Sequence, residues 1–584
     1  MEISLQSLLV EKLRHAMTTV YPEWKEGEPE VVQSSQEIFG HYQCNSCLKM
    51  GKALKLNPRA IAEKLKDFLL TDPTSKDLFS HIEVAGPGFL NMTLSASLLE
   101  TFVNDLLRDP FLGVPRPAVK ERIIVEFSSP NVAKELHVGH LRSTIIGDSI
   151  ARIFEFLGYD VLRLNHIGDW GTQFGMLISF LKEHHPEVFS GEIQTDLPSL
   201  MGWYKESKKK FDDDPDFKKR AQLQVVQLQG GNPEAISAWN RICHISRMAF
   251  QEIYDLMDVK TQERGESFYN PYLPGVVADL EKKGLVTISG GAKCVFLEGI
   301  VGRDGEPLPM IIQKTDGGFN YETTDMAALK HRVEEEKASR IIILTDAGQA
   351  LHFQMVFQAA QKAGYYDPAK VRLDHVTFGV VLGPDGKKFK TRSGEIEKLI
   401  DLLLEAVDRA RVIVSERLPD IAEDEKESIA KTLGIGAVKY ADLSGNRVKD
   451  YLFSYDRMLK FEGNTAAFLL YAFVRIQGIK RKGQKDLSKL LKEEKIVLVH
   501  LSEIQLALHL CQFAETLISI SSDLLPNRLT EYLYGLAEKF NAFYRDCRVE
   551  GTPEESSRLL LCEAAALTLQ KGLELLGLHT VPRM

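Results

Sequence analysis

The sequence predicts an α/β core built on a doubly wound parallel sheet, with a small α+β domain before it and an all-α helical bundle after it. Within residues 122–171 a short apolar run, a loop, a helical repeat and a second apolar run follow one another, which is the order of a βαβ unit. More strand-like runs, with a helical pattern between them, return at residues 340–382. These two groups of strands predict the core, and a chain of 584 residues has room for roughly three or four domains.

The elements divide the chain into three predicted units. Residues 1–115 contain helical stretches and an alternating segment with a Gly-Pro-Gly turn, and the proline-containing segment 108–122 links them to the core. The core occupies residues 116–454, and the polar, charged stretch at about 185–310 between its strand groups is expected to be a helical insertion. Residues 455–584 repeat apolar side chains three and four positions apart, which predicts a helical bundle.

Composition limits the class of protein. Apolar residues make up 44% and charged residues 26% of the chain, which are ordinary globular values. The longest apolar run, residues 466–474, is too short to span a bilayer, and the first residues lack the pattern of a signal peptide. We therefore expect no membrane partner. Because seven cysteines are scattered along the chain, we also expect a reducing cytoplasmic location.

The net charge of −9 argues only weakly against a nucleic-acid partner, because binding depends on local basic surface. One basic cluster lies at residues 480–495, although a solvated helix face is the simpler interpretation of that stretch alone.

Cys44 and Cys47 have the spacing of a zinc or redox pair. Zinc would need two more ligands at comparable spacing, and the other five cysteines form no second pair. His41 lies on the same short segment, where three ligands make a poor tetrahedron. We therefore interpret the pair as two small buried side chains and expect no protein-bound zinc.

The loop after the first core strand carries two histidines. The strand ends at Phe127, and a helix is expected to begin near Gly139, so His137 and His140 lie at a helix N-terminus beside the carboxyl end of a parallel strand. Free backbone N–H groups and the helix dipole favour anions there, and ligands bind at this edge of open α/β sheets. Gly139 has no side chain, so an adenine ring or a phosphate could approach its backbone closely.

Three interpretations of these histidines compete. As zinc ligands they would need a third ligand, for which Glu135 is the only local candidate. As structural residues they would have to be buried, which the neighbouring Lys134, Glu135 and Arg142 disfavour. As phosphate ligands they need only donate hydrogen bonds to a triphosphate in its transition state. Their position between a strand and a helix favours phosphate.

The motif His-Val-Gly-His, residues 137–140, resembles the HIGH signature of class I aminoacyl-tRNA synthetases. Its surroundings resemble the arginyl-tRNA synthetases in particular, and the resemblance extends along most of the chain in the family's order. The segments that carry it are 129–148, 165–175, 320–329, 348–357, 376–394, 540–549 and 577–584. It implies a Rossmann-like core, an N-terminal domain that contacts the tRNA elbow and a C-terminal domain that binds the anticodon.

The resemblance also implies an arginine pocket. A guanidinium is planar and permanently charged, so carboxylates hold it best. Tyr321 and Asp325 lie four residues apart on one face of an expected helix start, and the resemblance assigns them, with Glu126, to the guanidinium. Without the resemblance, Asp325 would more often be a helix cap and Tyr321 a half-buried anchor. The positions that match those orienting the amino acid's backbone end are Ser129, Asn131, Gln349 and His140.

The second signature of class I enzymes, KMSKS, is altered in this chain. The corresponding residues, 388–392, include Lys388 and Lys390, but Thr391 stands where the second lysine is usual. The resemblance implies that Lys134, ahead of the histidine motif, supplies the missing charge. The glycine- and lysine-containing loop 383–394 still offers cations to pyrophosphate.

Together these residues predict an arginine–tRNA ligase that forms arginyl-adenylate from ATP with Mg²⁺ and transfers arginine to tRNA(Arg). His137, Gly139 and His140 would contact the reacting phosphate of ATP, and Lys134, Lys388 and Lys390 the pyrophosphate. Tyr544, Arg545 and Arg548 offer aromatic and basic side chains for anticodon bases, although each could be ordinary helix surface or core. We expect a monomer. A catalytically silent tRNA-binding relative and a nucleotidyltransferase stay as alternatives.

Overall fold

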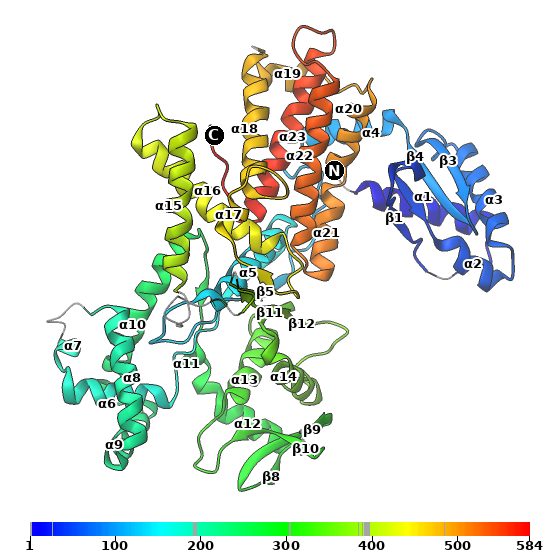
Figure 1. Cartoon of the computed structure of the whole chain (residues 1–584). Coiled ribbons are helices and arrows are strands. Elements are labelled where there is room, and N and C mark those ends of the chain that lie inside the picture. Colours follow the sequence, from blue (N-terminus) through cyan, green and yellow to red (C-terminus); the bar gives the residue numbers. More distant parts are fainter. Residues whose placement is uncertain are drawn as a thin grey trace.

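The computed structural model describes residues 3–25, 27–190, 195–302, 305–383, 385–387, 389, 398–483 and 485–584. Figure 1 shows three parts: an N-terminal domain that projects to one side, a helical C-terminal domain, and a core from which further helices and strands extend. This arrangement confirms the predicted fold class.

The N-terminal domain packs three helices on a four-stranded antiparallel sheet of order β1-β2-β4-β3. Leu5, Leu9 and Leu13 recur every fourth residue in the first helix and are fully buried, so one apolar face holds it to the domain. The elements are α1 (Leu5–Val20), β1 (Val31–Gln33), β2 (Tyr42–Cys44), α2 (Ser46–Leu54), α3 (Pro58–Thr71), β3 (Phe79–Ala85) and β4 (Phe89–Leu94). A further helix, α4 (Ala96–Arg108), leads towards the core.

The core sheet has five parallel strands in the order β12-β11-β5-β6-β7. The central strand β5 is buried except at its first residue, because helices and neighbouring strands cover it. The strands are β5 (Arg122–Glu126), β6 (Asp160–Asn165), β7 (Gln262–Glu263), β11 (Ala338–Asp346) and β12 (Arg372–Phe378). Helix α5 (Val138–Phe156) follows β5. Helix α13 (Tyr321–Glu334) precedes β11, and α14 (Ala350–Lys362) follows β11.

The stretch between β6 and β7 is helical, as the sequence predicts, with α6 (Thr172–His184), α7 (Glu187–Ser190), α8 (Leu197–Asp213), α9 (Pro215–Gln229) and α10 (Pro233–Leu256). After β7 come α11 (Glu266–Tyr269) and α12 (Leu273–Lys282), and then an antiparallel sheet of β8 (Thr287–Ser289), β9 (Ala292–Val301) and β10 (Pro307–Gln313). The expectation of helices alone is therefore wrong for this last part. Apolar residues of β9 and β10 pack against α13 and α14, and such pairing leaves little local signal in a charged stretch.

The C-terminal part is the predicted helical bundle. One described stretch, Leu501–Asp523, has the length and apolar composition of a membrane span, but it comprises two helices that are more than half buried in this bundle. Ahead of the bundle, still within residues 116–454, lie α15 (Leu399–Arg417), α16 (Glu423–Leu443) and β14 (Tyr451–Leu452). The elements of the bundle are α17 (Tyr455–Met458), α18 (Ala466–Lys482), α19 (Leu487–Glu493), α20 (Leu501–Cys511), α21 (Phe513–Asp523), α22 (Asn527–Asp546) and α23 (Glu555–Leu575).

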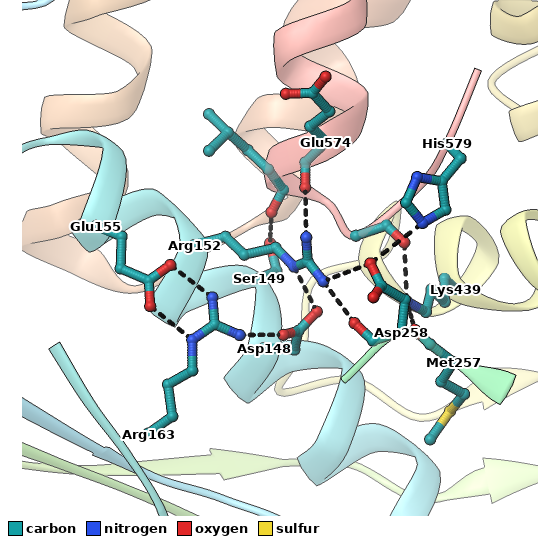
Figure 2. Close-up of polar contacts among 12 residues, drawn as sticks. Asp148, Ser149, Arg152, Glu155, Arg163, Met257, Asp258, Lys439, Glu574 and His579 are labelled. Carbon is teal, nitrogen blue, oxygen red and sulfur yellow. Dashed lines mark hydrogen bonds and ion pairs between the residues drawn. The ribbon is translucent and has the colours of Figure 1, made fainter. Parts of the chain in front are cut away.

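Helix α5 joins the core to this bundle through a polar junction, shown in Figure 2. Asp148, 2% exposed, accepts from Arg152 Nε at 2.8 Å and from Arg163 Nη1 at 2.6 Å. Lys439 of α16 donates to the Gly577 carbonyl at 2.8 Å, and Arg152 Nη2 donates to the Asp258 carbonyl at 2.6 Å. Ser149 Oγ of α5 donates to the Leu575 carbonyl at 3.1 Å, so the second half of the helix that begins at the histidine motif is held to the end of α23.

A second polar contact holds the N-terminal domain. Glu515 of α21 is 5% exposed and accepts from Tyr42 Oη at 2.7 Å and from Gln33 Nε2 at 2.8 Å. The backbone N–H of Gln6 donates to the same carboxylate at 2.8 Å. Three elements of the N-terminal domain therefore converge on one side chain of the bundle.

Candidate functional site

A cavity of about 910 Å³ opens where β5, β6 and β11 end. Its position is the carboxyl edge of a parallel sheet, where open α/β folds bind ligands. The structure brings most of the sequence-predicted site residues together on its wall: Glu126, Ser129, Asn131, His137, Gly139, His140, Tyr321, Asp325 and Gln349.

The two histidines form a reciprocal cap at the start of α5. His137 is the N-cap residue, and its Nδ1 accepts from the Gly139 N–H at 3.0 Å. His140 Nδ1 accepts from the His137 N–H at 3.1 Å. A ring nitrogen that accepts a backbone hydrogen bond carries no proton, so the proton of each neutral ring lies on Nε2. Both imidazoles therefore have a donor left for a ligand.

The environment keeps these rings neutral. Burial, reinforced by the nearby His137, lowers the pKa of His140 to about 3. Burial and then the charge of Lys134 lower the pKa of His137 as well. The ring centroids are 4.1 Å apart, and two protonated rings at that distance would repel each other. The histidines can thus act as neutral hydrogen-bond donors near pH 7.

Gly139 has a different local role from the one that we expected. A Cβ at this position would lie 2.7 Å from the His137 ring, and the Gly139 N–H is already bonded to that ring. The missing side chain therefore makes room for His137 itself. Close approach of a ligand to this backbone is limited on the side that the ring covers.

The loop between β5 and α5 has a strained backbone. Ser128, Ser129 and Ala133 have φ values of 71°, 49° and 61°, in the left-handed region that residues with a Cβ rarely adopt. Buried hydrogen bonds hold this conformation: Ser128 N–H donates to Ser143 Oγ at 3.0 Å, and Ser129 N–H to Asn165 Oδ1 at 2.9 Å. The Ser129 hydroxyl lines the cavity, is buried and has no hydrogen-bond partner among the described residues. It is available to a ligand.

Asn131 is held against the segment that follows β6. A parallel bridge joins it to Gly168, and Val132 N–H donates to the Gly168 carbonyl at 3.1 Å. A Cβ on Gly168 would lie 2.1 Å from Asn131 Oδ1, so only glycine leaves the Asn131 side chain its place.

Asp325 lines the same cavity and lies in the first turns of α13, next to two histidines. Its Oδ2 is 2.5 Å from His352 Nε2, and its Oδ1 is 3.9 Å from His166 Nε2. Tyr321, 53% exposed, places its ring 4.9 Å from that of His352. Asp325 thus has one oxygen tied to a histidine and one that can face a cationic ligand.

Glu126 is a carboxylate that is already paired with an arginine of the protein. Its Oε2 lies 2.5 Å from Arg332 Nη2, and both side chains are nearly fully buried. Arg332 comes from α13, the helix that carries Asp325. The charge of Glu126 is therefore partly balanced within the protein, although the residue still lines the cavity.

Glu266 is a cavity carboxylate that the sequence analysis missed. It begins α11, three residues after the end of β7, and its N–H donates to the Ile167 carbonyl at 3.0 Å. Burial and then the negative charge of Asp325 raise the pKa of Glu266 to about 8. An acidic residue shortly after a core strand is a signal that could have found it, but β7 has only two residues and does not stand out in the sequence.

The predicted lysines and Gln349 differ in where they lie relative to the cavity. Lys134 is exposed and does not line the cavity, although its charge reaches both histidines. Gln349 is exposed at the cavity rim. Lys388 and Lys390 lie outside the described residues.

The three predicted anticodon residues lie on or after α22, away from the cavity. Tyr544 is half-buried, with its ring centroid 6.5 Å from that of Phe540 and 5.0 Å from the Arg475 guanidinium carbon. Arg545 and Arg548 are exposed, and Arg545 pairs with Asp546 at 2.8 Å.

Cys44 and Cys47 are both fully buried, which confirms their interpretation as buried side chains. Burial raises the pKa of Cys47 to about 12, so its thiol stays protonated. Among the residues that the structure describes, no group of three or more His, Cys, Asp or Glu side chains is placed to hold a metal ion.

Comparison with known proteins agrees with this geometry. Three family models match: an arginyl-tRNA synthetase N-terminal domain at residues 5–94, the catalytic domain of class I (R) tRNA synthetases at 103–455, and a DALR anticodon-binding domain at 469–584. Curated arginine–tRNA ligases of Protochlamydia amoebophila and a Nostoc species are 60% and 50% identical, over 100% and 99% of both chains.

Solved structures are similar too. The Plasmodium falciparum arginyl-tRNA synthetase superposes with a TM-score of 0.86 at 33% identity over 100% of both chains. For the Thermus thermophilus enzyme the TM-score is 0.80 at 26% identity, over 99% of this chain and 100% of the other. The chain belongs to the arginyl-tRNA synthetases of class I.

Proposed function

We propose that this protein joins L-arginine to tRNA(Arg) in an ATP-dependent reaction through an arginyl-adenylate. Family membership supports the overall reaction. The observation that carries the proposal is that the same cavity holds two sets of groups: neutral imidazole donors at the start of α5, and carboxylates around Asp325 at the start of α13, which we call the carboxylate end.

In the first step, a carboxylate oxygen of arginine attacks the α-phosphorus of ATP. A mixed anhydride bond forms, the bond to the β-phosphate bridging oxygen breaks, and pyrophosphate leaves with that electron pair. No protein nucleophile is required, so positioning and charge stabilisation supply the rate. The Nε2–H donors of His137 and His140 are suited to the non-bridging phosphate oxygens, whose charge increases in the transition state.

The carboxylate end suits the guanidinium of arginine. A planar fork of N–H donors needs several acceptors, which Asp325 and Glu266 supply with support from Glu126. A lysine ammonium would leave part of this acceptor set unsatisfied, so the pocket discriminates against lysine. Ser129, Asn131 and His140 lie on the loop before α5 or at the start of that helix, and Gln349 lies just before α14; these four residues suit the ammonium and carboxylate of the substrate.

We assign Lys134, Lys388 and Lys390 to the leaving pyrophosphate. Mg²⁺ enters as part of the ATP substrate, with phosphate oxygens and water as its main ligands, and neutralises part of the triphosphate charge. Lys398, at the end of the lysine-rich segment, pairs with Glu135 at 2.8 Å, which fixes that end beside the histidine motif.

In the second step, the 2′-hydroxyl of the terminal adenosine of tRNA attacks the arginyl carbonyl. An ester bond forms, the bond between the carbonyl carbon and the phosphate oxygen breaks, AMP leaves with that electron pair, and the hydroxyl proton passes to solvent. We propose three domains: residues 1–115 for the tRNA elbow, 116–454 for catalysis with an insertion at about 185–310, and 455–584 for the anticodon. Tyr544, Arg545 and Arg548 are our candidate anticodon contacts. A monomeric cytoplasmic enzyme fits this reaction.

The test is arginine-dependent charging of bulk tRNA by the full chain with ATP and Mg²⁺. Formation of arginyl-tRNA supports the proposal. Binding of tRNA without charging would identify a catalytically silent relative, and nucleotide transfer to another acceptor without tRNA would identify a nucleotidyltransferase. Either of these results would overturn it.

A further inference from the structure

Arg142 lies two residues after His140, in the first turns of α5. The sequence pattern counts it among the charges that would keep the histidine region exposed, but its side chain is only 1% exposed. A guanidinium in that position needs a counter-charge and acceptors for its N–H groups.

The partners of Arg142 come from three separate segments. Its Nε lies 3.3 Å from Asp442 Oδ1 of α16, which is also 1% exposed. Its Nη1 donates to the Gly379 carbonyl at 2.8 Å and to the Lys449 carbonyl at 2.9 Å. The guanidinium carbon lies 5.2 Å from the centroid of the Tyr451 ring. One side chain therefore ties the histidine helix to the chain after β12 and to the chain before β14.

Gly379 starts the segment that leads into the lysine-containing loop. Together with Val380 and Val381 it lines the cavity, as Arg142 does. Val381 and Leu382 form β13, which pairs in parallel with β14, and Val380 N–H donates to Asp450 Oδ1 at 2.7 Å. A Cβ on Gly379 would lie 2.5 Å from the Lys449 carbonyl carbon, so glycine lets these two segments meet.

The same histidine segment holds the other end of that loop. Leu399 N–H donates to the Leu136 carbonyl at 3.0 Å, and an antiparallel bridge joins His137 to Lys398. The described residues on the two sides of the loop, Gly379 before it and Lys398 and Leu399 after it, are thus both held to residues 136–142. Arg142 makes the contact with Gly379, on the side that precedes the loop.

From this geometry we infer that Arg142, paired with Asp442, is a positioning residue for the nucleotide half of the site. It sets the distance between the histidine donors and residues 379–382, which precede the lysine-containing loop in the chain, by holding the Gly379 carbonyl against α5. The inference rests on the proposed function. Among the described residues, Arg142 has no contact with Asp325 or Glu266 at the carboxylate end of the cavity. Its loss should therefore lower kcat/KM for ATP and leave the affinity for arginine unchanged.

The test compares steady-state arginine-dependent ATP–pyrophosphate exchange, with tRNA present, for wild type and three variants. Arg142→Met removes the clamp. The double variant Arg142→Met, Asp442→Asn removes both charges, so that no lone carboxylate is left buried. Arg142→Lys keeps the charge, but a single ammonium cannot reproduce a planar fork, so it should restore only part of the activity.

We expect kcat/KM for ATP to fall about 10²-fold in the first two variants, the size of effect that follows from a misplacement of about 1 Å. The KM for arginine, and arginine binding measured by calorimetry without ATP, should stay at wild-type values. If Arg142→Met gives no folded protein, the double variant and Arg142→Lys provide the same comparison.

Arg152→Met is the matched control. Arg152 lies on the same helix and also binds a carboxylate and backbone carbonyls across the junction of Figure 2, but it does not line the cavity. The inference is overturned if Arg152→Met lowers kcat/KM for ATP as much as Arg142→Met, if KM for arginine rises in parallel with KM for ATP, or if Arg142→Met has no effect. Absence of exchange in the wild type would instead overturn the proposed function.

Discussion

The raised pKa of Glu266 predicts that arginine binding releases a proton. Glu266 shares the carboxylate end of the cavity with Asp325, whose negative charge, together with burial, raises the pKa of Glu266 to about 8. A guanidinium placed between these side chains reverses the sign of the local potential and favours the ionised form. The empty pocket should therefore hold a proton that the substrate displaces.

The magnitude follows from that pKa. At pH 7 a carboxyl group with a pKa of about 8 is protonated in about nine-tenths of the molecules, so binding should release nearly one proton. Removing that proton costs about 1.4 kcal/mol at pH 7, equivalent to about tenfold in affinity. The Kd for arginine should fall about tenfold per pH unit as the pH rises towards 8, and level off above it.

Calorimetric titration with arginine in two buffers of different ionisation enthalpy counts the released protons. Glu266→Gln is the control, because an amide of the same shape cannot titrate; it should bind arginine more weakly and show no pH dependence between pH 6 and 9. Zero proton release in the wild type, together with a Kd that is constant across this range, would refute the reasoning.

Three further predictions concern the rest of the molecule. Removing the Nε2–H donor by His140→Ala should lower arginine-dependent ATP–pyrophosphate exchange by about 10²–10³-fold while the circular dichroism spectrum is retained, and unchanged exchange would remove His140 from the site. Asp325→Asn should raise the KM for arginine by about 10²-fold, because a charge-assisted contact is lost beside His352, and an unaltered KM would exclude Asp325 from the pocket. The affinity for tRNA should fall steeply between about 50 and 200 mM salt despite the net charge of −9, and a flat salt response in filter binding would contradict a phosphate-contacting surface.

Local patterns predicted much of the architecture. The apolar run of β5, the helical repeat of α5 and the run of β6 follow one another closely, so a βαβ unit is visible in the sequence. The bundle helices are long and periodic, which makes their type clear. The strands β9 and β10 were missed, because their stability comes from pairing with each other and from packing on α13 and α14.

Site residues could likewise be predicted where local sequence defines their role, and could not where distant segments define it. His137 and His140 could be placed at a helix start because the turn and the helical repeat lie next to them in the chain. Glu266 and Arg142 could not be assigned, because the groups that define their roles come from distant segments. The pairing of Glu126 with Arg332 is equally non-local, and it changes a free carboxylate into one that the protein already balances.

The sequence by itself determined the order of the elements, the helix N-terminus that bears the histidines and the kinds of side chain that could meet ATP and arginine. These properties depend on periodicity and on neighbours along the chain. The tertiary structure alone decided which ring nitrogens carry protons, which carboxylates are paired, and how one buried arginine connects the histidine helix to Gly379, ahead of the lysine-containing loop. Such properties depend on burial and on hydrogen bonds between residues far apart in sequence, and only the folded chain brings those residues within reach of one another.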